Sequence, residues 1–560
     1  MSKKVQKNTS KPIKKESAPK VVTQPASGIE INWYFVGLGV ILLVVLLIRM
    51  RLLGIPLERD EGEYAYMGNL ILNGIPPYKD AYNMKLPGTY YMYALWMGMF
   101  GTTITGVHFG LLIMTIGTIL LLFFSFRTLF TSNVALIASG VYGLMSLSAN
   151  LLGFAAHATH FMTFYIALAL FFYSKFTKNR KWFWALLTGI ALGMSFLMKQ
   201  QAVFMLVFGF LMIVIYQVFE KPLPIKSLII NAGLYSIGVF IPYLLVLVIM
   251  SSTGVFDTFW FWTVQYASKY AGSGVSMDDA KMLFGMSFEP MYKEFMGIWW
   301  LCGAGLIITY FSKYDLRYKL LATGLFIFTF LTVCPGFYFR QHYFIPFLIS
   351  VGLMAGITLD AIAGGLADRL KINGLRVFGF VVLAIIAASA ITGFKDYYLK
   401  TKPEQLCKRI YGTNPFVESV EISKYLKENT TKEDKIAVLG SEPQIFFYAD
   451  RSSATGYIYT YGLMESHDYN KTMQKQMIDE IEKNKPKYLV YCNVRTSWLP
   501  RPDSPMDIFT WFNKYSTENY EVVGIVDGLN SYQPQYKWNE LAKTSQPQGE
   551  EYILVFKRKV

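Results

Sequence analysis

Apolar runs of about 20 residues recur along this chain, and each is long enough to cross the hydrocarbon core of a bilayer as a helix. Of the 560 residues, 53% are apolar and only 16% are charged, whereas about 25% of the residues in an ordinary soluble domain carry a charge. A helix pairs its backbone polar groups within one segment, as the membrane interior requires. The sequence therefore predicts a polytopic α-helical membrane protein.

The apolar runs predict about eleven membrane-spanning helices. They cover residues 31–53, 104–126, 133–150, 160–175, 183–198, 202–219, 227–250, 298–312, 319–334, 343–364 and 375–394. Residues 54–103, between the first two runs, are more polar and form a long loop. Residues 31–394 thus make up the predicted membrane domain.

The net charge of +15 is concentrated outside the apolar runs. Seven lysines occur in the first 20 residues, within a Ser-, Pro- and Lys-rich segment (1–30) that we expect to be a disordered cytoplasmic tail. Other basic residues fall in short connections between predicted spans: Lys175, Lys178, Arg180, Lys181, Lys221, Lys226, Lys313, Arg317, Lys319, Arg369, Lys371 and Arg376. This positive-inside pattern orients a membrane protein and does not indicate a nucleic acid partner. Alternation from a cytoplasmic N-terminus places the 54–103 loop and the region after Gly393 outside, in a cell membrane.

The last third of the chain, residues 395–560, has the pattern of an external α/β domain. Residues 435–440, 487–494, 520–526 and 551–559 read as strands, and residues 470–486 read as a helix. No phosphate-binding glycine pattern occurs there, so we do not expect a nucleotide-binding enzyme. Cys407 and Cys492 lie in this domain, and the sequence leaves their pairing open.

The first loop, "LERDEGEYAYMGNLILNGIPPYKDAYNMKLPGTYYMYALWMGMFG", places acids directly after the first span. Tyr64, Met67, Leu70 and Ile71 recur at helical spacing, which predicts an amphipathic helix at the membrane surface. "NGIPPY" ends that helix, and a second helix begins near "KLPG".

Polar side chains also mark other span ends on the predicted external side: His157, His160, Lys199, Arg340 and His342. Ionisable residues at the membrane are functional candidates. A carboxylate pair, Asp60 and Glu61, facing several cations suits transfer from an anionic leaving group to an acceptor hydroxyl. The carboxylate accepts the proton of the acceptor, and the cations stabilise a departing phosphate. Nucleotide-activated donors are not expected outside the membrane, so we expect a lipid-carried donor.

The first loop resembles that of the GT-C glycosyltransferases in the protein O-mannosyltransferase and aminoarabinose transferase superfamily. The resemblance rests on an Asp-Glu pair, a Tyr-Ala pair, Lys-x-Pro and a Tyr-rich helix ending in Phe-Gly, present here as Asp60-Glu61, Tyr64-Ala65, Lys85-Leu86-Pro87 and Phe100-Gly101. "GIALGMSFLMKQQAVFML" and "FYFRQHYFIPFLISVGLMA" are similar to later segments of the family. The resemblance implies a GT-C fold and an inverting transfer of one sugar from a polyprenyl-phosphate donor.

The resemblance also implies roles for individual residues. Asp60 would be the catalytic carboxylate, and Glu61 would support it or help to bind the acceptor. Lys85 would contact the donor phosphate, with Lys199 and Arg340 nearby. The remaining predicted substrate-binding residues are His342, Tyr343, Tyr64, His157 and His160.

Alternatives remain at this level. Asp60 with His157 and His160 offers ligands for a divalent metal, but a polar helix end without metal is favoured, and we expect no metal cofactor. A transferase using a lipid-diphosphate donor and a lipid-sugar flippase are the competing functions; a transporter predicts internal repeats, and none is visible. The acceptor is a glycolipid, polysaccharide or protein, the sugar is open, and the expected state is a monomer in contact with membrane lipid.

Overall fold

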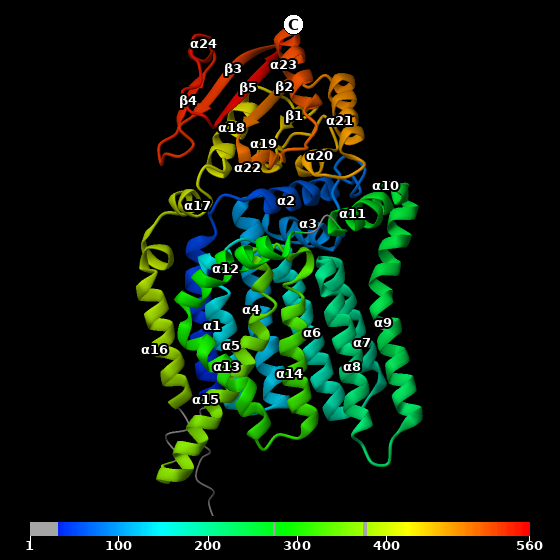
Figure 1. Ribbon diagram of the computed structural model, residues 1–560, viewed down its shortest axis with the longest axis vertical. Helices are drawn as coiled ribbons and strands as arrows, with labels where there is room; N and C mark the ends of the chain where they lie inside the picture. The colour runs from blue at the N-terminus through cyan, green and yellow to red at the C-terminus, as the bar shows by residue number, and fades with distance from the viewer. Residues whose placement is uncertain (1–31, 273–274, 373–377, 560) are drawn as a thin grey trace, which may run out of the picture.

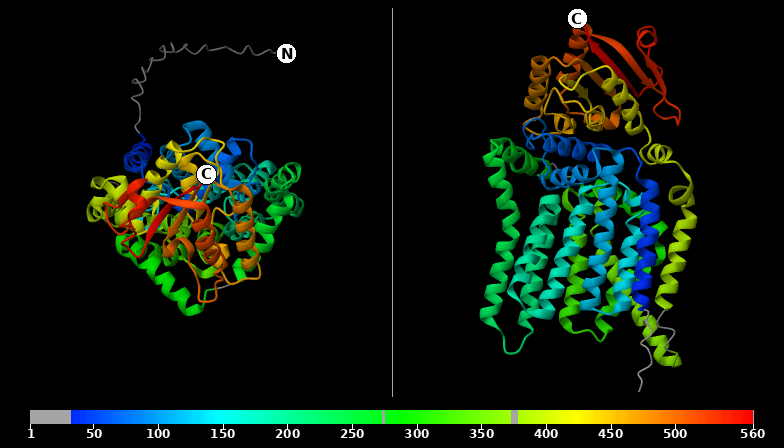
Figure 2. Two further views of the ribbon diagram at one scale, coloured as in Figure 1. Left: turned by 90° about the horizontal axis from the view of Figure 1, so that it is seen from above. Right: turned by 180° about the vertical axis from the view of Figure 1, so that it is seen from behind.

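The computed structural model describes residues 32–272, 275–372 and 378–559, and it places a small α/β domain on one end of a tall helical bundle (Figure 1). The predicted N-terminal tail and Arg376 lie outside these residues. The two views in Figure 2 show the domain covering the end of the bundle.

The bundle contains one helix for each predicted span. These helices are α1 (Trp33–Leu52), α4 (Ile104–Leu129), α5 (Ser132–Met145), α6 (Ala158–Asn179), α7 (Trp182–Met198), α8 (Val203–Val218), α9 (Ile225–Ser252), α13 (Met296–Phe311), α14 (Leu316–Leu331), α15 (Leu348–Leu370) and α16 (Phe378–Gly393). Within the described residues, five helices are long and apolar enough to cross a membrane by themselves: α1, α4, α8 with the residues before it, α9 and α15. The pair α12 (Met277–Glu294) and α13, bent by 102°, makes a sixth candidate. A multi-pass helical protein is therefore confirmed, whereas the count of eleven spans stays a prediction.

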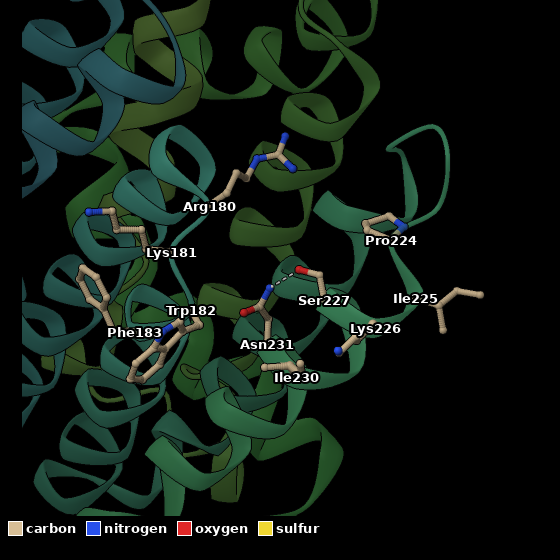
Figure 3. Close-up of a pocket in the computed structure, with 10 residues that line it drawn as sticks. All are labelled: Arg180, Lys181, Trp182, Phe183, Pro224, Ile225, Lys226, Ser227, Ile230 and Asn231. Atoms are coloured by element: carbon tan, nitrogen blue, oxygen red, sulfur yellow. Dashed lines mark hydrogen bonds between the residues drawn. The ribbon is translucent and has the colours of Figure 1, made fainter.

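The basic connections lie at the end of the bundle away from the α/β domain. Figure 1 shows the α6–α7, α8–α9 and α13–α14 connections at that end. A cleft of about 670 Å³ opens there between the first two, and Arg180, Lys181 and Lys226 are among the residues that line it (Figure 3). The fold thus separates the basic loops from the predicted first-loop site by the length of the bundle.

The first loop forms two helices, α2 (Arg59–Leu72) and α3 (Gly88–Phe100), which lie across the end of the bundle beneath the α/β domain (Figures 1 and 2). α2 begins at a capping box: Glu58 accepts a hydrogen bond from the backbone of Glu61, and Glu61 accepts one from the backbone of Glu58. The predicted helix is confirmed, and most of it is buried. The α/β domain covers the side of α2 that carries Arg59, Gly62 and Tyr66.

The segment between α9 and α13 lies on the same side as the first loop. It contains α10 (Phe256–Trp260), a π-helical turn (Phe261–Tyr266), α11 (Ala267–Gly272) and α12. The Trp262 ring stacks on Tyr82 of the first loop with centroids 5.9 Å apart, and Lys269 pairs with Asp468 of the α/β domain at 3.0 Å. This segment therefore connects the bundle, the first loop and the domain.

The α/β domain contains a five-stranded sheet with the order β1-β2-β5-β3-β4. Its elements are α17 (Pro403–Tyr411), α18 (Phe416–Glu428), β1 (Ile436–Leu439), α19 (Gln444–Ala449), α20 (Tyr461–Met464), α21 (Asn470–Asn484), β2 (Tyr488–Asn493), α22 (Arg495–Trp498), α23 (Asp507–Asn519), β3 (Tyr520–Asp527), β4 (Gln535–Trp538), α24 (Glu540–Lys543) and β5 (Tyr552–Arg558). β1 and β2 are parallel and the other pairs are antiparallel. Sequence patterns found every strand except β4, a short polar edge strand. Cys407 and Cys492 are unpaired thiols.

The domain is fixed to α2 by buried polar contacts. The Arg59 guanidinium pairs with the Glu442 carboxylate at 2.9 Å, and its Nε donates to the Ser441 carbonyl at 2.5 Å. In the middle of α2, the Tyr66 hydroxyl accepts from the backbone N–H of Ser453 at 2.8 Å. A buried pair requires such additional hydrogen bonds, because each charge has lost its hydration. The domain and the first loop therefore form one unit.

Close packing at Gly62 predicts that domain docking is sensitive to one methyl group. A Cβ there would lie 2.6 Å from the backbone nitrogen of Gln444, at the start of α19. Gly62→Ala should lower the stability of the protein by about 1–3 kcal/mol, the usual cost of overpacking, measured as a lower melting temperature in detergent. Gly39→Ala, where a Cβ meets nothing within 4 Å, is the control and should leave the melting temperature unchanged or raise it slightly. Equal behaviour of the two variants would contradict the tight docking.

Candidate functional site

A cavity of about 950 Å³ lies between the end of the bundle, the first loop and the α/β domain. Eight of the ten predicted site residues line it: Asp60, Tyr64, Lys85, His157, Lys199, Arg340, His342 and Tyr343. These residues come from four separate stretches of the sequence. The fold thus brings together in one cavity side chains that the sequence predicted only to lie on the external side of the membrane.

The Lys-x-Pro-Gly motif anchors the start of α3 on the end of α7. A Cβ at Gly88 would lie 2.5 Å from the Leu197 carbonyl oxygen, so only glycine permits this approach. The Thr89 hydroxyl donates to the Met198 carbonyl at 3.0 Å, and the Gln200 amide donates to the Met84 carbonyl at 3.0 Å. Because both chain segments are tied together here, Lys85 and Lys199 enter the same cavity.

Asp60 lies in the first turn of α2, and Lys85 links it to a second carboxylate. Lys85 Nζ is 2.9 Å from Asp60 Oδ1 and 2.5 Å from Glu63 Oε2. The Tyr90 hydroxyl donates to the other oxygen of Glu63 at 2.7 Å. Glu63 is three residues after Asp60 and therefore shares its helix face. The sequence analysis did not include Glu63 among the site residues, although this spacing indicated it.

The two carboxylates of this network differ in pKa. Burial opposes ionisation of Asp60, but the charge of Lys85, followed by that of Lys199, lowers the pKa of Asp60 well below its ordinary value. For Glu63, burial outweighs the charge of Lys85 and raises the pKa. Asp60 lines the cavity and Glu63 does not, so Asp60 is the better candidate for a base.

Lys199 is a cation of a different kind from Lys85. Its Nζ lies 4.0 Å from the centroid of the Tyr343 ring, and among the described residues no carboxylate forms an ion pair with it. Burial lowers the pKa of Lys199 to about 7, and the charges of Lys85 and Arg340 act in the same direction. Arg340 is exposed at the edge of the cavity. An anion placed here would restore the charge of Lys199, so this side of the cavity suits a phosphate.

His157 and His342 stack on each other beside Asp60, with ring centroids 3.9 Å apart and planes 12° apart. Both rings are buried; burial lowers the pKa of His157 to about 4 and that of His342 well below its ordinary value, so both are neutral. Both ring nitrogens of His157 and Nδ1 of His342 have no hydrogen-bond partner among the described residues. They are therefore available to polar groups of a substrate.

Asp60, His157 and His342 offer ligand atoms within 4.8 Å of one another, which raises the question of a metal. His342 takes the place that the sequence gave to His160. One feature opposes a metal ion here. The in-plane lone pairs of the two stacked rings run side by side instead of converging on one point, as metal coordination requires. As arranged, the two rings do not share one metal ion.

Glu61 and His160, the other two predicted site residues, are buried outside the cavity lining. The Glu61 carboxylate lies 2.9 Å from His108 Nε2 and accepts from the backbone N–H of Ala156 at 2.6 Å. It therefore ties α2 to α4 and to the segment before α6. This matches the supporting role that the sequence gave to Glu61 as one of two options. His160 is buried in the first turn of α6.

The α/β domain supplies cavity residues that sequence reasoning missed. Tyr459, Tyr461, Glu465 and Thr496 all line the cavity. The Tyr459 hydroxyl donates to Asp60 Oδ1 at 3.2 Å. No local motif marks these residues. They lie almost 400 residues after Asp60 in the sequence, and they reach the cavity only because the α/β domain docks on the first loop.

Comparisons with known proteins identify the fold. The dolichyl-phosphate-mannose-protein mannosyltransferase family matches residues 84–246. The crystal structure of ArnT from Cupriavidus metallidurans bound to undecaprenyl phosphate is similar over 93% of this chain and 98% of that one, with a TM-score of 0.56 and 15% identity. The oligosaccharyltransferase AglB from Archaeoglobus fulgidus, in complex with an inhibitory peptide and a dolichol-phosphate, is similar over 91% of this chain and 74% of that one, with a TM-score of 0.52 and 12% identity. No curated protein sequence matches the chain significantly.

The family match includes Lys85 of the first loop and also His157 and Lys199, and the fold match extends over the α/β domain as well. Together they show that this chain has the fold of ArnT and AglB, and that residues 84–246 are similar to the dolichyl-phosphate-mannose-protein mannosyltransferase family.

Proposed function

We propose that the protein is an integral-membrane, inverting glycosyltransferase that moves one sugar from a polyprenyl-phosphate donor to the hydroxyl of an acceptor. The observation that carries this proposal is a single cavity lined by an ionised carboxylate, Asp60, and by two cations, Lys199 and Arg340. Phosphate recognition by the homologous fold supports it, since the ArnT and AglB structures contain undecaprenyl phosphate and dolichol-phosphate.

The proposed reaction is one displacement at the anomeric carbon. The acceptor hydroxyl gives its proton to Asp60 while its oxygen bonds to that carbon. The bond from the carbon to the phosphate oxygen breaks, and the phosphate leaves with both electrons and one more negative charge. Lys199 and Arg340 stabilise that charge. Attack from the side opposite the leaving phosphate inverts the configuration.

A lipid-linked donor agrees with the apolar wall next to Lys199. Phe196, Val203, Phe204 and Tyr243 line the cavity on the side of α7, α8 and α9. Val203 is 43% exposed on the bundle. A polyprenyl chain placed along this wall would bring its phosphate to Lys199, while the acceptor enters from the side of the α/β domain. We propose that this domain lies outside the cell membrane, that the basic loops lie in the cytoplasm, and that the protein acts as a monomer.

Asp60→Asn is the direct test of the base. The amide keeps the shape of the side chain but cannot accept a proton, so transfer of labelled sugar from a polyprenyl-phosphate donor should fall by roughly 10²–10⁴-fold. Asp80→Asn, at an exposed aspartate of the same loop outside the cavity lining, is the matched control and should keep wild-type transfer. Near wild-type transfer by a folded Asp60→Asn protein would remove Asp60 from the chemistry.

The low pKa of Lys199 predicts a pH dependence of donor use. Lys199 faces Asp60, Lys85, Arg340 and Tyr343, and it is charged below its pKa of about 7 and neutral above it. Donor kcat/KM, which reports the free enzyme, should therefore fall as the pH rises through 7, by up to roughly 10- to 100-fold, the value of a hydrogen bond to a charged group. Bound phosphate raises the pKa of Lys199, so kcat should change less.

Lys199→Arg separates this effect from other titrations. Arginine stays charged, so the fall in kcat/KM near pH 7 should disappear in the variant. A fall that persists unchanged in Lys199→Arg would show that another group titrates.

We propose that transfer needs no metal cofactor, because the ring nitrogens of the stacked His157 and His342 do not converge on one ion. Wild-type protein treated with excess EDTA should transfer sugar at its untreated rate. Activity that is lost with EDTA and returns with a divalent cation would contradict this proposal without affecting the assignment of Asp60.

A further inference from the structure

The two carboxylate oxygens of Asp60 have different surroundings. Oδ1 accepts hydrogen bonds from Lys85 Nζ at 2.9 Å and from the Tyr459 hydroxyl at 3.2 Å. Oδ2 has no hydrogen bond within the described part of the chain, and His157 Nδ1 lies 4.0 Å from it. Only Oδ2 is therefore open to a proton from a substrate.

The Tyr459 hydroxyl is held in place from the opposite side of the cavity. Its segment, residues 453–461, is bound to the first loop by two backbone contacts: the Ser453 N–H donates to the Tyr66 hydroxyl at 2.8 Å, and the Gly456 carbonyl accepts from the Tyr82 N–H at 2.8 Å. Glu480 fixes the segment from behind, accepting from the Gly456 N–H at 2.9 Å. These contacts fix the position of Tyr459, and they form only when the α/β domain is docked on the first loop.

The ring of Tyr459 adds to this arrangement. It packs edge-on against Tyr461 with centroids 4.8 Å apart, and Lys85 Nζ lies 5.3 Å from its centroid. Tyr459 thus contacts both members of the Asp60–Lys85 ion pair. A carboxylate that had only Lys85 as a partner could turn about its last bond, because that torsion has broad minima.

We propose that Tyr459 is a positioning residue for the transfer: its hydroxyl, together with Lys85, holds Oδ1 of Asp60 so that Oδ2 points at the acceptor. This inference rests on the proposed function. It makes the α/β domain a part of the catalytic centre, since the domain supplies one of the two groups that orient the base.

Tyr459→Phe tests the hydroxyl alone, because the ring and its packing remain. Misorienting a catalytic group costs up to about 10²-fold in rate, so we expect kcat to fall by roughly 10- to 100-fold with full-length protein, at an unchanged KM for the donor. The melting temperature and the binding of undecaprenyl phosphate, which needs no proton transfer, should stay at wild-type values.

Tyr457→Phe is the matched control. Its hydroxyl also lies in the 453–461 segment, but it donates to Gln476 and does not line the cavity. This variant should keep the wild-type kcat. The two variants should differ only in kcat. A general loss of structure in the 453–461 segment would lower the activity of both.

Three results would overturn the inference. Equal kcat for the Tyr459→Phe, Tyr457→Phe and wild-type proteins would show that the hydroxyl does not orient Asp60, while the glycosyltransferase assignment would stand. A lower melting temperature with lost undecaprenyl phosphate binding in Tyr459→Phe would assign Tyr459 to the fold. Absence of transfer by wild-type protein from any polyprenyl-phosphate sugar would remove the proposed function itself, and the inference with it.

Discussion

Two carboxylates share one buried ammonium group at the centre of this protein, and the rest of the site depends on that arrangement. Lys85 bridges Asp60 and Glu63 where the membrane bundle meets the α/β domain. Charges that lose their water need partners of good geometry, and an unpaired member would be strongly destabilising. Burial raises the pKa of Glu63, whereas the nearby cations lower that of Asp60. This difference supports the proposal that Asp60 is the base.

Two lysines of the same cavity are held in opposite states. Burial disfavours the charge of both, but Lys85 has two carboxylates and its pKa is raised, whereas Lys199 pairs with no carboxylate among the described residues and its pKa is lowered to about 7. Lys85 therefore holds Asp60, the proposed base, and an anion bound at Lys199 would favour its charged form. The family resemblance alone would give the phosphate to Lys85; because Lys85 is already paired with two carboxylates, we favour Lys199 for it.

The α/β domain determines more of the site than its sequence suggests. Its polar contacts to Arg59 and Tyr66 hold α2, and its residues Tyr459 and Tyr461 complete the cavity wall. From its sequence, a domain with a short, mixed sheet and no cofactor motif would be interpreted as accessory to the membrane domain. In the structure it covers the side of α2 that carries Arg59, Gly62 and Tyr66.

Sequence patterns predicted much of the fold because they report local physics. Apolar runs located the bundle helices, and "NGIPPY" separated α2 from α3 as expected. β4 was missed because a four-residue polar edge strand has no apolar alternation. Glu63 was within reach, since it lies one turn from Asp60 on the same helix.

The sequence by itself determined a multi-pass helical protein, an acid-rich first loop with a Lys-x-Pro turn, and a set of cations at span ends, because hydrophobicity, capping and turn chemistry act over a few residues. Only the tertiary structure decided which of these side chains meet. His342 rather than His160 stacks on His157, Glu61 turns to His108, and Tyr459 reaches Asp60. Such contacts join segments up to 399 residues apart, and they depend on how helices and domain pack, which no local pattern encodes.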